Sequence, residues 1–143
     1  MIDPAVIIAA KVAQKATKVP ASVSIAQYGL ESGWGKHEPP GSNNPFGIKA
    51  FHGGGVNAMT TEVIGGKVIH VEQPFAIYPS LTGAFLAHAH IISTLGVYAP
   101  AMAVLPDVTK FVKLMAQHYA TDPHYADKIL GLIQADGLTK YDS

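Results

Sequence analysis

Acidic side chains are the simplest starting point in this 143-residue chain, because only ten Asp and Glu residues have to be sorted. One carboxylic acid that protonates a leaving oxygen, helped by a second carboxylate, is the requirement for hydrolysis of a glycosidic bond. Asp3, Asp107 and Asp122 each precede an expected helix and are interpreted as its N-cap. Glu31 and Glu62 remain as candidates for catalysis. The other acids have polar or proline neighbours: Glu38, Glu72, Asp127, Asp136 and Asp142.

Glu31 stands in the last turn of an apolar helix that we expect over residues 20–32, with Gly33 as its C-cap. The negative end of the helix dipole disfavours an ionised carboxylate there, and desolvation by nearby Trp34 has the same effect. Both effects raise the pKa of the carboxyl, which suits a general acid that works near neutral pH. By position alone, an exposed glutamate at a helix end is the commoner interpretation, so the assignment needs a further argument.

Glu62 lies in a predicted strand, on the same face as Thr60 and Ile64 by strand alternation. Taken alone, it is better interpreted as a solvated strand residue, paired with Lys67. If the strand folds over a groove, however, Glu62 reaches the opposite side of a sugar from Glu31.

Five aromatic residues complete the inventory of side chains that could stack on a sugar or hydrogen-bond an N-acetyl group. The alternative is that these rings are simply core, and for Phe46 the two interpretations weigh equally. Tyrosine favours a groove, because its hydroxyl needs a partner when the ring is buried. The candidates for substrate contact are Trp34, Phe46, Tyr78, Tyr119 and Tyr125.

Several other kinds of site are excluded. The chain has no cysteine, which rules out disulfides, thiolate metal sites and a cysteine nucleophile. His88 and His90 are two residues apart on an expected helix, so they point to different faces and make a poor pair of metal ligands. The sequence has no Gly-x-Ser-x-Gly elbow and no phosphate-binding glycine loop. We therefore expect no metal ion and no cofactor.

The overall composition limits the classes of partner that the chain could bind. The formal net charge is zero with histidine neutral, which argues against nucleic acid as a ligand. No apolar run reaches the roughly 18 residues of a membrane span, so we expect no integral membrane segment. The first residues lack the basic and apolar stretches of a signal peptide.

These candidate residues need elements to position them. Thr60–Ile64 and Lys67–Val71 flank Gly65-Gly66, which predicts a β-hairpin, and a third short strand is expected at Phe75–Tyr78. Residues 33–55 are rich in Gly, Pro and Asn and are interpreted as an ordered functional loop. Helical periodicity and caps predict helices over residues 3–18, 20–32, 80–95, 108–120 and 122–135.

The order of these elements predicts one domain of helix-dominated α+β fold over residues 1–143. Its helical body comprises residues 1–35 and 80–138, and the loop and small β lobe comprise residues 36–79.

Four motifs in the same order resemble the glucosaminidases of glycoside hydrolase family 73. Ser22–Gln27 followed by Leu30-Glu31-Ser32-Gly33-Trp34-Gly35 is similar to the helix that carries the family's acid. Asn43–Lys49 resembles its Asn-Asn-Leu-Phe-Gly-Ile-Lys segment. The β-lobe pattern and the segment with a functional tyrosine are also present, as Thr60-Thr61-Glu62, Phe75–Ser80 and Tyr119–Ala126.

The resemblance implies a lysozyme-like fold and an endo-β-N-acetylglucosaminidase. Its substrate would be the glycan strand of peptidoglycan, cleaved at the β-1,4 bond between N-acetylglucosamine and N-acetylmuramic acid. Glu31 matches the family's acid, Glu62 its second glutamate and Tyr125 its functional tyrosine, and we expect Asn44 to contact substrate. Pro45 departs from the usual Leu, which restricts Asn44 and reshapes the loop.

Alternatives remain open at this stage. A lytic transglycosylase or a muramidase would act on the same polymer, and a non-catalytic wall-binding or virion structural module would keep the fold. We expect a monomer that acts at the bacterial wall, in the periplasm or outside the cell. Without a recognisable signal peptide, its delivery is expected to depend on a phage, a holin or a secretion machine.

Overall fold

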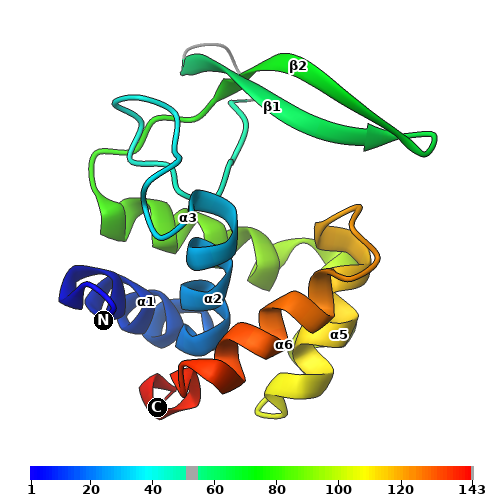
Figure 1. The fold of residues 1–143 in the computed structure, drawn as a ribbon. Helices are drawn as coiled ribbons and strands as arrows, with labels where there is room; N and C mark the ends of the chain where they lie inside the picture. The colour runs from blue at the N-terminus through cyan, green and yellow to red at the C-terminus, as the bar shows by residue number, and fades with distance from the viewer. Residues whose placement is uncertain (51–54, 143) are drawn as a thin grey trace.

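The computed structural model describes residues 1–50 and 55–142, and for Glu62 it describes the backbone only. Figure 1 shows a body of helices with a long β-hairpin above it. The elements in chain order are α1 (Pro4–Thr17), α2 (Ala21–Ser32), β1 (Val56–Ile64), β2 (Lys67–Phe75), α3 (Leu81–Thr94), η1 (Gly96–Tyr98), α4 (Ala99–Ala103), α5 (Val108–Tyr119), α6 (Tyr125–Ala135) and η2 (Leu138–Tyr141).

Side-chain caps fix where the helices begin. The carboxylate of Asp3 accepts the N–H of Ala5 at the start of α1, and that of Asp107 accepts the N–H of Lys110 at the start of α5. The predicted start of the last helix at Asp122 is wrong, because α6 begins at Tyr125. The Asp122 carboxylate accepts the N–H of His124 at 2.8 Å, which forms a turn before the helix rather than its cap.

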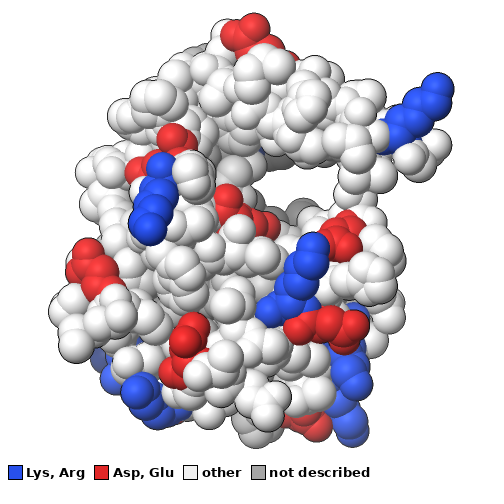
Figure 2. Space-filling view, viewed as in Figure 1, with Lys and Arg blue, Asp and Glu red and all other residues white. Residues whose placement is uncertain are grey.

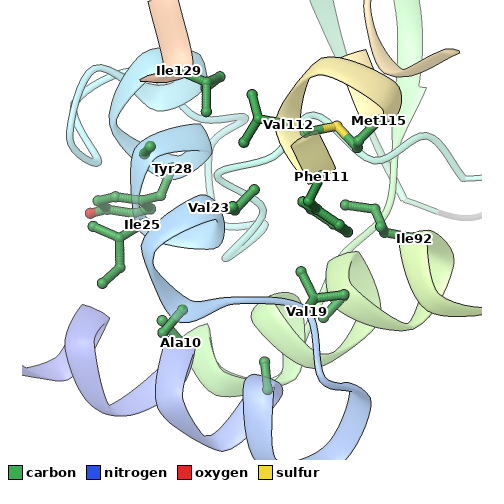
Figure 3. Packing of buried hydrophobic residues seen from close by; sticks show 14 of the residues in the cluster. Ala10, Val19, Val23, Ile25, Tyr28, Ile92, Phe111, Val112, Met115 and Ile129 are labelled. Atoms are coloured by element: carbon green, nitrogen blue, oxygen red, sulfur yellow. The ribbon is translucent and has the colours of Figure 1, made fainter. Parts of the chain in front are cut away.

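Helix α2 lies at the centre of the helical body, and every residue from Ala21 to Gly29 is buried. Such a helix has to meet apolar partners on all sides. Figure 3 shows Val23 of α2 among side chains of α5 and α6, with Phe111 and Val112 beside it. Burying a side chain of this size stabilises the fold by roughly 1.5–3 kcal/mol, so the packing holds α2 firmly in place.

The C-terminal segment fastens the start of α2. The Asp142 carboxylate accepts hydrogen bonds from the backbone N–H and the hydroxyl of Ser22, each at 2.7 Å. The residue at the N-cap position of α2 is Pro20, which offers no side-chain acceptor. Asp142 therefore supplies from a distant part of the chain the cap that the helix lacks.

The predicted hairpin is confirmed and is longer than expected. β1 and β2 pair antiparallel from Val56 opposite Phe75 to Ile64 opposite Lys67. Gly65 and Gly66 have φ values of 57° and 78°, and positive φ at both central residues is what a type I′ turn needs.

The predicted third strand over residues 75–78 is wrong. Phe75 is the last residue of β2, and the segment after it pairs with the preceding loop instead. The N–H of Ala76 donates to the carbonyl of Ile48, and the N–H of Tyr78 donates to that of Ser42. The Gly- and Asn-rich loop is thus tied to the base of the hairpin.

Over the residues that the structure describes, no single helix is both long and apolar enough to cross a membrane. Leu81–Thr94 and Gly96–Ala103 reach that length and hydropathy only together, and the pair is bent by 75° at its break.

Candidate active site

The side chain of Glu31 lines a cavity of about 710 Å³ that lies between the helical body and the hairpin. Figure 2 shows the molecule hollowed beneath the hairpin, with acidic atoms visible in the hollow. The last turn of α2 places Glu31 on one wall, and Thr60 and Thr61 of β1 line the opposite side. The loop from His37 to Lys49 and the segment after α5 close the remaining walls.

Two tyrosines hold the two oxygens of the Glu31 carboxyl group. The hydroxyl of Tyr119 donates to Oε2 at 3.3 Å, and that of Tyr125 donates to Oε1 at 3.2 Å. Their rings stack with centroids 5.5 Å apart. Gln27 Nε2 donates to the oxygen of Tyr125 at 3.0 Å, and this directs the proton of that hydroxyl toward Glu31. Side chains from α2, α5 and α6 therefore fix one carboxyl group.

Burial raises the pKa of Glu31 to about 8, while the hydrogen bonds from Tyr125 and Tyr119 act in the opposite direction. Desolvation wins, so the carboxyl group holds its proton at neutral pH. Burial and the charge of Glu31 also raise the pKa of both tyrosines, which keeps them hydrogen-bond donors. The prediction of a raised pKa at Glu31 is confirmed. Trp34, expected to contribute to it, lines a different hollow.

The second predicted glutamate can be placed only by its backbone. Glu62 pairs with Ile69 in the hairpin, and its neighbours Thr60 and Thr61 line the cavity. The side chain of Glu62 lies outside the described residues.

Glu38 is a cavity residue that sequence reasoning missed. It lines the same cavity as Glu31, and burial raises its pKa. It was set aside because prolines follow it. Its place in the loop already interpreted as functional, shortly after Glu31, was the signal that could have found it.

Asn44 and Phe46 line the cavity from beneath. Asn44 is fully buried, its Nδ2 donates to the carbonyls of Ile48 and Ala76, and its Oδ1 accepts the N–H of Ile48. Both donor hydrogens of its amide are therefore occupied by the loop. Phe46 is 5% exposed and stacks on the ring of His88, with the two ring centroids 4.0 Å apart. Both residues shape the wall more than they offer free groups.

Tyr78 lies outside the set of residues that line the Glu31 cavity. It is half-buried, and its backbone carbonyl accepts a hydrogen bond from Asn43 Nδ2 at 3.0 Å. Tyr119 is in the cavity, and Tyr125 touches Glu31. The structure thus brings Glu31 together with Tyr119 and Tyr125, but not with Tyr78 or Trp34.

Among the side chains that the structure describes, no group of three or more His, Asp and Glu residues is arranged to hold a metal ion. The arrangement is suited to proton transfer from the neutral carboxyl group of Glu31 to a ligand bound in the open groove.

The sequence model of the glucosaminidase family, described as mannosyl-glycoprotein endo-beta-N-acetylglucosaminidase, matches residues 8–138. The chain belongs to the glucosaminidase family. This match confirms the resemblance drawn from the four motifs, and it makes the chain a glycoside hydrolase.

Two relatives extend the comparison. The chain is 36% identical over 133 residues to an autolysin of Enterococcus faecalis, covering 86% of this chain and 18% of that protein. It is 33% identical over 133 residues to a probable N-acetylmuramidase of Lactococcus lactis, covering 85% of this chain and 30% of that protein. The chain thus spans less than a third of the length of each of these two relatives.

A solved structure shows the same fold at nearly full length. The crystal structure of a peptidoglycan hydrolase mutant from Sphingomonas sp. A1 matches with a TM-score of 0.84 and 32% sequence identity. The match covers 96% of this chain and 94% of that one. The expected fold of a glucosaminidase, helix-dominated and lysozyme-like with a small β lobe, is confirmed by this likeness.

Proposed function

We propose that this glucosaminidase domain hydrolyses the glycan strands of bacterial peptidoglycan, cleaving the β-1,4 bond between N-acetylglucosamine and N-acetylmuramic acid. One observation carries the proposal: a single carboxyl group with a pKa of about 8 faces a groove and is held by two tyrosine hydroxyls. The names of an autolysin and of a peptidoglycan hydrolase among its relatives support the polymer. That polymer places the site of action at the bacterial cell wall, and we expect the domain to work there as a monomer.

Glu31 is the general acid in this proposal. The neutral carboxyl group donates its proton to the glycosidic oxygen as the bond from that oxygen to the anomeric carbon breaks. The carboxylate left behind keeps the hydrogen bonds from Tyr119 and Tyr125, which favour its charged form. Burial therefore keeps Glu31 protonated before the reaction. The two hydroxyls then favour the carboxylate that forms when the proton leaves. Tyr125 acts here by positioning Glu31.

A second carboxylate completes the reaction. Glu62 on the hairpin either takes a proton from the attacking water or stabilises the developing positive charge while the substrate's own acetamido group attacks. Glu38 is a further candidate for the same task, because it lines the cavity with Glu31. Replacing each by glutamine separates them: the residue that activates water is the one whose loss lowers turnover on peptidoglycan by about 10²-fold or more.

The loop residues Asn44 and Phe46 have a supporting part in this proposal. Asn44 fastens the loop and Phe46 fills the space behind it, so both set the width of the groove. Tyr78, near the base of the hairpin, supports the same loop through its backbone. Direct contact with the sugar then falls to Glu31, Tyr119 and the β1 wall.

A muramidase is the second candidate, because the Lactococcus relative is named a probable N-acetylmuramidase. The two activities leave different sugars at the new reducing end. Digested peptidoglycan is reduced with borohydride, and the fragments are identified by mass spectrometry. Reduced N-acetylglucosamine ends support the proposal, and reduced N-acetylmuramic acid ends replace it with the muramidase. Anhydro ends, one water lighter, would identify a lytic transglycosylase.

A further inference from the structure

A second hollow of about 650 Å³ lies away from the Glu31 cavity, beside the start of the chain and the end of α2. It holds the single tryptophan of the sequence, Trp34, which is 38% exposed. Its aromatic and charged walls are formed by Asp3, Tyr28, Trp34, Lys36, Asp136 and Tyr141, with Lys140 at the rim.

The indole of Trp34 lies face down on α2. A Cβ built on Gly29 would stand 2.5, 2.6 and 2.7 Å from three neighbouring atoms of its six-membered ring. Distances so nearly equal place that position over the face of the ring, and not at its edge. Gly29 therefore makes room for the ring, and the opposite face of the indole points outward. Tyr28 meets Trp34 edge to face, with centroids 6.2 Å apart.

Holding Trp34 in this position has a cost. Its backbone has a φ of 60°, in the left-handed region that bulky residues avoid. A conformation of this kind persists only where the surroundings enforce it, and such residues cluster at functional sites. Here the fold accepts the strain and leaves a large apolar ring on the surface, where burial would otherwise be favoured.

The rim around this platform offers hydrogen-bonding groups of both kinds. Asp3 and Asp136 supply acceptors, and Lys36 and Lys140 supply donors. Tyr141 adds a second ring, with Lys140 Nζ 5.2 Å from its centroid.

Tyr28 of the hollow and Glu38 of the Glu31 cavity interact electrostatically. Tyr28 lines the hollow and Glu38 lines the cavity. After burial, the charges of Glu38 and Asp3 are the largest causes that raise the pKa of the Tyr28 hydroxyl, so this group is close to both acids.

We propose that this hollow is a second carbohydrate-binding site, which holds an N-acetylhexosamine unit of the strand that Glu31 cleaves. The inference rests on the proposed function for the identity of the strand. The apolar face of a pyranose stacks on the outward face of Trp34, and its hydroxyls, which donate and accept, use the mixed rim.

Intrinsic fluorescence tests this inference directly, because Trp34 is the only tryptophan. The Glu31→Gln variant, which keeps the ligand intact, is titrated with N-acetylglucosamine hexamer, and calorimetry on the same samples measures total binding. We expect a saturable shift of the tryptophan emission that follows the calorimetric isotherm. Binding in the calorimeter without a change in tryptophan emission would overturn the site. A change in emission with free stem peptide, and none with the sugar, would overturn it too.

Kinetics on the wild-type background provide the second arm. Trp34→Asn removes the ring with a residue that tolerates positive φ, and Gly29→Ala keeps the ring but displaces it. We expect KM on peptidoglycan to rise by about tenfold in both variants, as for loss of an aromatic anchor, with kcat changed less than about twofold. Ile8→Gln, on an exposed apolar residue of α1, is the matched control and should change neither.

The two proposals fail separately. If no reducing ends appear but the fluorescence titration saturates, the hydrolase is rejected and the sugar site stands. If hydrolysis proceeds with Trp34 silent and KM unchanged in both variants, the second site is rejected and the hydrolase stands.

Discussion

Replacing Glu31 by Gln should make the protein relatively more stable as the pH rises. The folded carboxyl group has a pKa of about 8, against an ordinary value of 4.5. Below the lower value both folded and unfolded chains hold the proton, and the burial costs nothing extra. Between the two values the unfolded chain releases its proton while the folded chain keeps it, so the free energy of unfolding falls as pH rises.

The size of the effect follows from the two pKa values. One pH unit is worth about 1.36 kcal/mol per proton, so from about pH 5 to about pH 7 the wild type loses roughly 2–3 kcal/mol through this group. Glutamine is neutral and has nearly the same shape, so the free energy of unfolding of the Glu31→Gln variant lacks this dependence on pH. The difference between variant and wild type should therefore grow by that amount over the interval.

Urea unfolding followed by tryptophan fluorescence measures the difference at each pH. Glu72→Gln, on an exposed residue of β2, is the matched control and should run parallel to the wild type. A difference between Glu31→Gln and wild type that stays constant with pH would mean that Glu31 ionises normally. The physical basis for its role as an acid would then be refuted.

Three further predictions follow from other buried groups of the helical body. Asp142→Ala leaves the N–H and hydroxyl of the buried Ser22 without their acceptor and should lower the free energy of unfolding by about 1–3 kcal/mol in urea titrations; an unchanged midpoint would contradict the capping role. Tyr125→Phe removes a hydrogen bond that lowers the pKa of Glu31, so the alkaline limb of kcat/KM should move to higher pH while turnover falls; a limb that stays in place would separate Tyr125 from the acid. Burial lowers the pKa of His88 to about 3, so wild-type stability should fall as pH drops below about 6.5, and His88→Leu should lose much of that fall; equal acid sensitivity would refute it.

The sequence predicted the helices and hairpin well where local signals were strong. Asp3, Asp107 and the Gly65-Gly66 pair act through neighbours only a few residues away, and each performs the expected task. The short elements Gly96–Tyr98, Ala99–Ala103 and Leu138–Tyr141 were missed, because one helical turn carries too few positions to show a period.

Contacts between distant residues explain what sequence reasoning could not find. Asp142 was grouped with ordinary polar acids, yet it caps α2 because the chain returns to Ser22. The pKa of Glu31 was predicted in the right direction, but Trp34 was named as a cause of its desolvation. The side chains that contact the carboxyl group are Tyr119 and Tyr125, and their hydrogen bonds lower this pKa. The backbone turns left-handed at Trp34, and this carries the ring to the other hollow.

One helix therefore links stability to chemistry in this glucosaminidase. The apolar length of α2 is buried on all sides, its start is capped by Asp142 and its last turn presents Glu31 to the groove. A carboxyl group on so rigid a support keeps its geometry relative to the tyrosines, which is what preorganised proton transfer requires.

The central claim is that Glu31 supplies the proton that cleaves the glycan. The most direct test is the rate at which purified peptidoglycan gains reducing ends with wild type, with Glu31→Gln and with Glu72→Gln as the control for a surface carboxylate. We predict that Glu31→Gln loses at least about 10²-fold in rate while remaining folded, and that the control keeps the wild-type rate. A folded Glu31→Gln variant that still releases reducing ends at close to the wild-type rate would contradict the claim.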